Sequence, residues 1–184
     1  MITSKDEYYQ YLKMDALANN QKYNMVIKWQ RIYRKYEYYR NCRKKIVFLP
    51  YVILLKRYYE SLSIKLGFSI PINVFGPGLS IAHYGTIVVN GNAKIGKNCR
   101  IQEGVTIGAT NGSVKAPVIG DNVFIGSGAK IIGDITIADD VCIGAGSVVV
   151  KSIIEKGITV AGVPAKKISD NDSHSNLNSA LFKE

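Results

Sequence analysis

His83 is the residue of this sequence best suited to acid–base chemistry. The chain has two histidines, and only His83 lies in a patterned segment, two positions after Ile81. Imidazole changes its charge near neutral pH, so an exposed histidine can serve as a general base. An ordinary surface histidine at a turn is the alternative. We expect the other histidine, His174, to be a surface residue without function.

The segment around His83 carries a repeat of six residues. Six residues at about 3.3 Å each make one flat side of a coil, which suits stacked short strands better than a helix or one long strand. This period predicts a parallel β-helix, with an ordinary β-sandwich as the alternative. The aliphatic positions in one phase are Ile95, Ile101, Ile107, Ile119, Ile125, Ile131, Ile137, Ile143 and Val149.

Two irregularities interrupt the repeat. An earlier run, Phe75, Ile81 and Ile87, has the same period but lies two residues out of phase. We expect two extra residues to be absorbed near Asn90-Gly91. Ser113 replaces an aliphatic residue, so residues 108–117 are expected to leave the wall as a loop.

The repeat also predicts a partner for His83. If three sides make a coil, the side that begins at Ile101 lies one turn beyond the side that begins at Ile81. Glu103 would then stand next to His83, because neighbouring strands are about 4.8 Å apart. A carboxylate at that distance can orient the imidazole ring. With the loop folded over the same cleft, these groups indicate general-base chemistry on a hydroxyl or amine.

Three regions follow from the composition along the chain. Residues 1–66 show helical spacing of apolar and aromatic residues, with helices expected over 5–20, 22–42 and 46–66. Residues 67–168 form the β-helix domain. Residues 169–184 are polar and are expected to be disordered. The predicted fold class is mainly β: a left-handed parallel β-helix with an N-terminal α-helical region that caps its first coil.

The positive charge of the chain lies in the helical region. The net charge is +10, and residues 1–67 hold 14 Lys and Arg against 5 Asp and Glu. The clusters Arg31-Arg34-Lys35 and Arg40-Arg43-Lys44-Lys45 allow three interpretations: a solvated helix face, contact with an anionic membrane surface or a lipid-linked phosphate, and nucleic-acid binding. No nucleic-acid-binding motif accompanies them, so we expect no nucleic-acid partner.

Several other classes of protein and site are disfavoured. The three cysteines are widely spaced and odd in number, which suits free thiols in a reducing compartment. No His, Cys and carboxylate spacing suits a metal, so we expect none. The first ten residues do not resemble a signal peptide, and the longest apolar run is too short to span a bilayer. We therefore expect a cytoplasmic protein, with peripheral attachment at the inner face of the membrane as an option.

Several sequence blocks resemble the hexapeptide acyltransferases of the left-handed β-helix class. Within that class they are most similar to serine acetyltransferases and their relatives in capsular and surface-polysaccharide biosynthesis. The resemblance covers residues 67–168. It rests on the blocks Leu79-Ser-Ile-Ala-His83-Tyr-Gly-Thr-Ile-Val-Val89, Val105-Thr-Ile-Gly-Ala-Thr110, Ile125-Gly-Ser-Gly-Ala-Lys130, Ile143-Gly-Ala-Gly-Ser-Val-Val149 and Ala161-Gly-Val-Pro-Ala165.

The resemblance implies a mechanism and an assembly. It implies acetyl-CoA as the acetyl donor, a homotrimer with active sites between subunits, and His83 as the base that deprotonates the acceptor hydroxyl. It also implies that the pantetheine arm of acetyl-CoA runs along the wall, near the residues Gly108, Ala109, Ser127 and Ala145. The nucleotide phosphates would lie near Lys166 and Lys167, where a lysine point charge suits a phosphate.

Two departures from the serine acetyltransferase pattern bear on the acceptor. Where those enzymes carry an aspartate fifteen residues before the histidine, this chain has Phe68, and their loop histidine is absent from Val114-Lys-Ala-Pro117. We expect the aromatic Phe68 to face a sugar ring. The first hypothesis is therefore an O-acetyltransferase acting on a sugar or a surface-polysaccharide intermediate. The alternatives are a serine O-acetyltransferase of cysteine biosynthesis and a non-catalytic β-helix scaffold.

Overall fold

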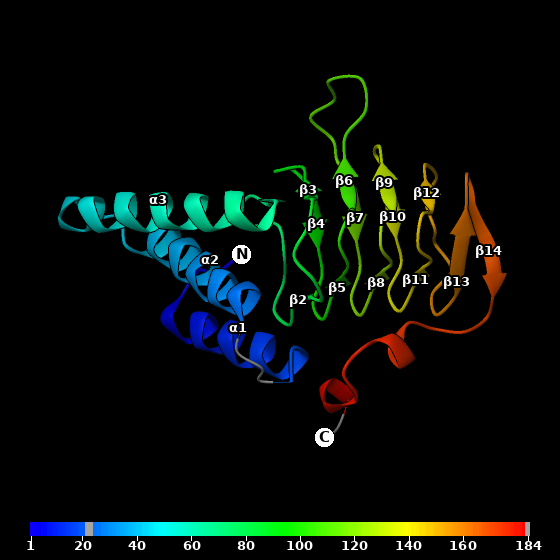
Figure 1. Cartoon of the computed structure of the whole chain (residues 1–184), viewed down its shortest axis with the longest axis horizontal. Helices are drawn as coiled ribbons and strands as arrows, with labels where there is room; N and C mark the ends of the chain where they lie inside the picture. The colour runs from blue at the N-terminus through cyan, green and yellow to red at the C-terminus, as the bar shows by residue number, and fades with distance from the viewer. Residues whose placement is uncertain (21–23, 183–184) are drawn as a thin grey trace.

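The protein combines three N-terminal helices with a β-helix, as a computed structural model shows (Figure 1). The structure describes residues 1–20 and 24–182. Helix α1 spans Lys5–Ala18, α2 spans Met25–Cys42 and α3 spans Leu49–Leu66, with a short 3-10 turn, η1, at Ile46–Phe48 before α3. The helical region and the parallel β-helix expected from the sequence are both confirmed.

In the part of the chain that the structure describes, fourteen short strands build three sheets that form the sides of the β-helix. Their orders are β1-β3-β6-β9-β12, β4-β7-β10 and β2-β5-β8-β11-β13-β14, and every pair is parallel except the closing β13–β14 hairpin. We call these the first, second and third sheet. The strands are β1 Phe68–Ser69, β2 Ser80–Ile81, β3 Ile87–Val89, β4 Lys94–Ile95, β5 Arg100–Ile101, β6 Thr106–Gly108, β7 Val118–Ile119, β8 Phe124–Ile125, β9 Lys130–Ile132, β10 Thr136–Ile137, β11 Cys142–Ile143, β12 Val148–Val149, β13 Thr159–Gly162 and β14 Ala165–Ser169.

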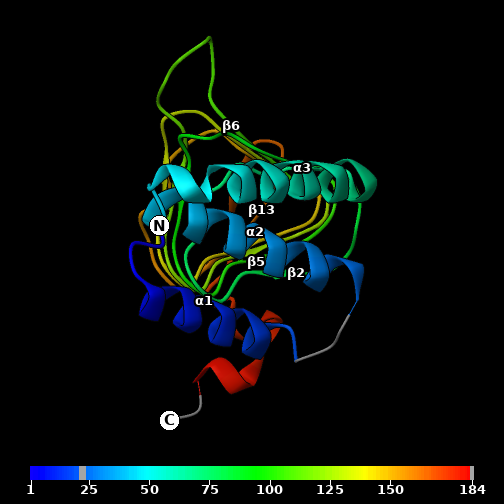
Figure 2. The same cartoon turned by 90° about the vertical axis from the view of Figure 1, so that its left-hand side faces the viewer.

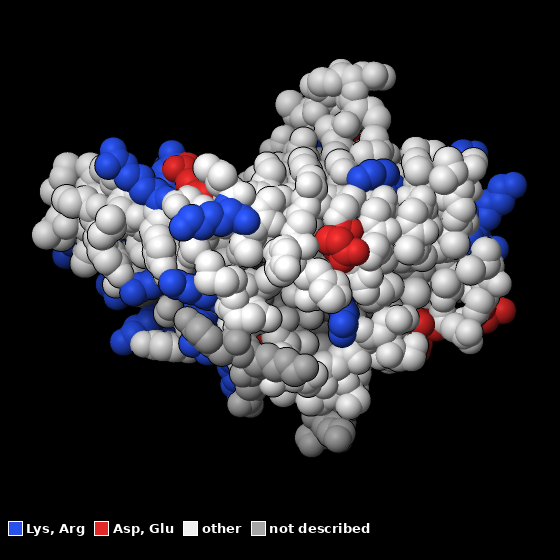
Figure 3. Space-filling view, in the orientation of Figure 1, with Lys and Arg blue, Asp and Glu red and all other residues white. Residues whose placement is uncertain are grey.

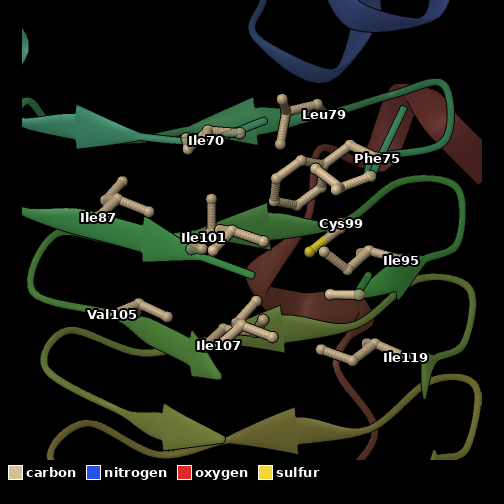
Figure 4. Packing of buried hydrophobic residues seen from close by; sticks show 14 of the residues in the cluster. Ile70, Phe75, Leu79, Ile87, Ile95, Cys99, Ile101, Val105, Ile107 and Ile119 are labelled. Carbon is tan, nitrogen blue, oxygen red and sulfur yellow. The ribbon is translucent and has the colours of Figure 1, made fainter. Parts of the chain in front are cut away.

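The six-residue repeat places one aliphatic residue of each side in an internal column. On the third sheet Ile81 pairs with Ile101 and Ile101 pairs with Ile125, and all three side chains are buried. Figure 4 shows aliphatic side chains of successive coils packed on one another inside the wall. Because each coil covers the next, the columns form one continuous hydrophobic core.

The helices lie across the end of the β-helix, over its first coil (Figure 2). Trp29 and Tyr33 on α2 stack with ring centroids 5.0 Å apart, and Phe68 meets Trp29 edge-on at 5.0 Å. All three are buried. Trp29 and Tyr33 therefore join the helices to the core of the β-helix, while Tyr11 and Tyr38 form a smaller separate cluster with Ile2.

Arg34 is the polar centre of this contact. Its guanidinium pairs with Asp15 at 2.8 Å and Glu37 at 3.1 Å, and it donates to the carbonyl oxygens of Phe75 and Gly76 at 2.9 and 2.6 Å. Although burial lowers the pKa of Arg34, the charge of Asp15 raises it overall. Arg34 is fully buried, so the interpretation of Arg31-Arg34-Lys35 as a solvated face is wrong for Arg34.

The second basic cluster lies at the surface. Arg40, Arg43, Lys44 and Lys45 surround a hollow near the start of α3, together with Ile46. Figure 3 shows Lys and Arg side chains mainly over the helical region in that view. In the described part of the chain no helix has the length and apolar character needed to cross a membrane.

The C-terminal segment differs from the expectation of disorder. Residues 169–182 follow a defined path that includes two 3-10 turns, η2 at His174–Asn176 and η3 at Ser179–Phe182. The His174 ring contacts Asp140 Oδ1 at 2.8 Å and stacks on Phe182 at 4.2 Å. Asn178 donates to the carbonyl oxygen of Leu17. Polar side chains thus fix this segment to the β-helix and to α1, which a composition argument cannot detect.

Candidate active site

His83 lies at the corner between β2 and β3, where the chain takes two more residues than in later coils. Ile81 pairs with Ile101 and Val89 pairs with Ile107. Eight positions therefore separate Ile81 from Val89 in this coil, whereas six separate Ile101 from Ile107 in the next. The extra residues fall in the His83 corner and not near Asn90-Gly91, so that expectation was wrong. They carry His83 out from the wall, and its side chain is exposed.

Glu103 occupies the corresponding corner of the next coil. The amide of Gly104 donates to the carbonyl oxygen of Thr86 at 2.7 Å, which holds the two corners together. Gly85 has φ of +141°, and a Cβ added there would lie 3.0 Å from Glu103 Cβ. A glycine at position 85 therefore allows both the backbone angle and the close approach of the two corners.

The Glu103 carboxylate is ionised beside His83. Hydrogen bonding by the Ser127 hydroxyl and, to a smaller degree, by the main chain of Glu103 and the electrostatic influence of His83 lower the pKa of Glu103. The Ser127 hydroxyl can also donate to Gln102 Oε1, which lies 2.7 Å away, and its single proton serves one of the two acceptors at a time. Among the described residues, Glu103 Oε2 is buried and has no hydrogen-bond partner. One oxygen of the carboxylate thus remains without a donor among the described residues.

His83, Glu103, Ser127 and Ala145 form a single line along one edge of the β-helix. Each residue stands two positions after a column residue of the third sheet, and those column residues pair in register. Main-chain bonds of 2.8 Å join successive corners, from Gly128 to Glu103 and from Gly146 to Ser127. Two of the residues expected near pantetheine, Ser127 and Ala145, therefore share an edge with His83.

Gly108 and Ala109 lie on a different corner, between the first and second sheets. Gly108 ends β6 and pairs with Ile132 of β9. The loop after β6 projects from this corner (Figure 1), where Lys115 pairs with Asp134 at 2.8 Å. The His83 corner and the corner of the loop are separated by one side of the coil, and six extended residues measure about 20 Å. Within the described chain, the loop makes its contacts at its own corner and not over the His83 cleft, contrary to our expectation.

Lys166 and Lys167 lie on β14, in the hairpin that closes the far end of the β-helix (Figure 1). Both side chains are exposed. The Lys167 ammonium contacts Asp170 and Glu155, each at 2.6 Å, and these hydrogen bonds raise its pKa. Because two carboxylates already neutralise Lys167, Lys166 is the better placed of the two for a phosphate.

A polar pocket of about 170 Å³ lies beside His83. The end of α1 and the start of α2 form one wall, and β2 and β5 form the other. Its described lining contains no carboxylate: Ala18, Asn19, Asn20, Asn24, Ile27, Ser80, Ile81, Ala82, His83 and Arg100. The asparagines and Arg100 were missed by the sequence analysis. Arg100 could have been found, because it immediately precedes a column residue and must point outward.

Phe68 does not face this pocket. It lies at the start of β1, pairs with Ile87 and packs edge-on against Trp29. Its side chain is only 5% exposed. The expectation that Phe68 faces a sugar ring was therefore wrong, since the ring is part of the core that joins helix and coil.

The described residues contain no group of three His, Cys, Asp or Glu side chains that would hold a metal ion. The groups of this edge that suit acid–base chemistry are the His83 imidazole and the Glu103 carboxylate. Cys99, which lies inside the wall, does not contribute, because burial raises its pKa to about 12.

Comparison with known proteins agrees with this architecture. The family described as bacterial transferase hexapeptide (six repeats) matches residues 116–151. A serine acetyltransferase of Staphylococcus xylosus is 34% identical over 151 residues, which is 77% of this chain and 67% of that enzyme. Two serine acetyltransferases of Staphylococcus epidermidis are 34% identical over 71% of this chain, which spans 62% of their length.

Solved serine acetyltransferase structures share the fold. The Neisseria gonorrhoeae enzyme superposes with a TM-score of 0.72 at 28% identity, covering 98% of this chain and 72% of the enzyme. Its complex with serine gives 0.69 at 28% identity over 90% and 71%. The Brucella abortus enzyme in complex with coenzyme A gives 0.67 at 28% identity over 90% and 68%. This chain belongs to the serine acetyltransferase family of hexapeptide-repeat transferases, which are acetyl-CoA-dependent O-acetyltransferases.

Proposed function

We propose that this chain transfers the acetyl group of acetyl-CoA to a hydroxyl, with L-serine as the acceptor that the comparisons favour. The observation that carries the proposal is the exposed His83 imidazole, one coil from the ionised Glu103 and beside a polar pocket. The serine acetyltransferase relatives and the structure of one of them with serine support this acceptor.

His83 is the general base in this proposal. Its imidazole accepts the proton of the acceptor hydroxyl while the hydroxyl oxygen attacks the thioester carbonyl carbon. The C–S bond then breaks, and the imidazolium returns the proton to the departing thiolate. The products are an acetyl ester and free CoA, and His83 is regenerated. Glu103 holds the ring and stabilises the transient imidazolium through its negative charge.

The residues expected to contact acetyl-CoA suggest more than one copy of the chain. Ser127 and Ala145 continue the His83 edge, whereas Gly108 and Ala109 lie on another corner. A single site that includes both pairs requires a second subunit, which supports the homotrimer with sites between subunits. Lys166 is proposed to approach the nucleotide phosphates, as an exposed point charge can.

A sugar hydroxyl is the second candidate acceptor. The pocket beside His83 supports it, because three asparagines and Arg100 line the pocket and its described lining offers no carboxylate for the ammonium group of serine. Amide side chains are donors and acceptors that suit hydroxyl groups. Phe68 no longer supports this candidate, because it is buried.

The test is a comparison of acceptors. Purified protein and acetyl-CoA would be incubated with L-serine, D-serine, free sugars and nucleotide sugars, and thioester loss would be followed by absorbance. Turnover with L-serine and not D-serine would support serine acetylation. Turnover with sugars alone would support the second candidate. Absence of both turnover and acetyl-CoA binding would contradict the proposal and favour the non-catalytic scaffold.

A further inference from the structure

Arg100 lines a polar pocket and has no ion-pair partner among the residues that the structure describes. It lies on β5 immediately before the buried Ile101, so its side chain projects from the outer face of the third sheet. There it neighbours Ser80 of β2 and Phe124 of β8. Within residues 1–20 and 24–182, Arg100 Nε is buried and has no hydrogen-bond partner.

Burial of the Arg100 Nε–H group without a hydrogen-bond acceptor costs free energy unless a ligand supplies the acceptor. A buried donor that loses water without gaining a protein acceptor costs about 1–3 kcal/mol, and more when it is charged. The contrast with Arg34 is clear, because Arg34 is satisfied by two carboxylates and two carbonyl oxygens.

The surroundings favour a negative ligand. Arg100 and His83 line the same pocket, and no carboxylate belongs to its described lining. Asp15 and Glu37 are engaged by Arg34, and Glu103 lies at the corner of the wall. An anion that enters the pocket would therefore meet an unneutralised guanidinium and no repelling acid among the described lining residues.

We propose that Arg100 binds an anionic group of the acceptor, a carboxylate or a phosphate, and so holds its hydroxyl toward His83. The planar guanidinium can make two parallel hydrogen bonds to either group. The inference rests on the proposed acetyl transfer and adds a specificity determinant to it. Serine meets the requirement through its carboxylate, and among sugars the inference selects uronic acids and sugar phosphates over neutral sugars.

The test measures steady-state kinetics with acceptors that differ in one anionic group. The pairs are L-serine with L-serinamide, and glucose with glucuronate and glucose 1-phosphate, so the two anion types are distinguished. Arg100→Gln should raise KM for the preferred anionic acceptor about 10- to 100-fold, the range expected for a charged hydrogen bond. The kcat at saturation and the KM for acetyl-CoA should change less than about two-fold. Arg100→Lys keeps the positive charge but loses the planar pair of N–H donors. Its KM for the anionic acceptor should lie between those of wild type and Arg100→Gln.

Arg57→Gln is the matched control, because Arg57 is an exposed arginine of α3. It should leave every parameter unchanged. The inference would be overturned if Arg100→Gln impaired neutral and anionic acceptors equally, or lowered kcat with KM unchanged. Circular dichroism would confirm that the variant is folded.

A binding measurement separates this inference from the proposed function. L-serine, glucuronate and inorganic phosphate would be titrated into wild-type, Arg100→Gln and His83→Ala proteins by calorimetry. We expect one of these anions to bind wild type and His83→Ala, and to lose at least ten-fold in affinity with Arg100→Gln. If anion binding depends on Arg100 while no acceptor is turned over, the proposed acetyl transfer fails and the anion site stands. If none of the anions binds wild type, the Arg100 inference is wrong.

Discussion

Glu103 lies one coil beyond His83 on the same edge of the β-helix, because Ile81 and Ile101 pair in register. The two extra residues in the His83 corner do not displace this relationship. Instead they move His83 outward, while Gly85 lets the corner remain against Glu103. The carboxylate is thus fixed by the regular wall, and the imidazole stands on an irregular segment that the solvent can reach.

Replacing His83 with alanine tests the base directly. Removal of a general base typically costs about 10²- to 10⁴-fold in rate, and we expect kcat to fall within that range. The side chain is exposed, so the fold should be preserved, and thioester loss with circular dichroism would show both effects. His174→Ala is the control, because it removes the only other histidine of the sequence. Equal rates in wild type and His83→Ala would contradict the assignment.

Glu103→Gln tests the positioning carboxylate through pH. Hydrogen bonding by Ser127 and, to a smaller degree, the electrostatic influence of His83 lower the pKa of Glu103 below its ordinary value. Glu103 is therefore already ionised at pH 6, and its charge does not change as the pH rises to about 9. We expect kcat of Glu103→Gln to be about 10- to 100-fold lower across that range, less than the loss of the base itself. A kcat equal to that of wild type would contradict the positioning role.

Arg34→Met tests the contact between helices and β-helix. The substitution leaves Asp15 and Glu37 buried without their cation, and breaking a buried ion pair in this way typically costs about 3–5 kcal/mol. We expect that loss in the free energy of unfolding, measured by urea denaturation. Arg57→Met, at the exposed face of α3, should change it by less than about 0.5 kcal/mol. If Arg34→Met also changed the free energy of unfolding by less than about 0.5 kcal/mol, the ion-pair network would contribute little to stability.

The surface cluster of Arg40, Arg43, Lys44 and Lys45 is proposed to contact anionic membranes. It adjoins the 3-10 turn before α3, where Ile46 is 84% exposed. Basic residues near an anionic surface contribute about 1 kcal/mol each. We expect flotation with vesicles that contain phosphatidylserine and none with neutral vesicles. Reversal of two charges, as in Lys44→Glu with Lys45→Glu, should abolish it. Flotation that does not depend on lipid charge would remove the proposal.

Much of the fold could be predicted because a β-helix repeats one local rule. The six-residue period of Ile101, Ile125 and Ile143 reports directly on which side chains turn inward, and the same rule gave the stacking of Glu103 on His83. The helices were found from their spacing, to within a few residues at each end. These features depend on short stretches of sequence, which a periodic pattern captures.

The features that could not be predicted from the sequence depend on contacts between segments that are distant along the chain. Arg34 appeared as one member of a basic cluster, and only the folded chain brings Asp15 and the carbonyl oxygen of Gly76 to it. The sequence suggested that Phe68 would face the acceptor, yet its ring packs against Trp29 in the core. The pocket beside His83 likewise needs residues 19 and 20 and Asn24 brought to the wall by the helices.

The way in which the helices meet the first coil has a consequence for solubility. Asp15 accepts hydrogen bonds from the amides of Gly78 and Leu79, each at 2.9 Å, while Gln30 donates to the carbonyl oxygen of Leu79 at 2.7 Å and Arg34 to that of Gly76. Side chains thus occupy main-chain groups that another strand would otherwise pair with. An open strand edge is a template for edge-to-edge growth into fibres. The same residues that anchor the helices therefore keep the stack finite at this end.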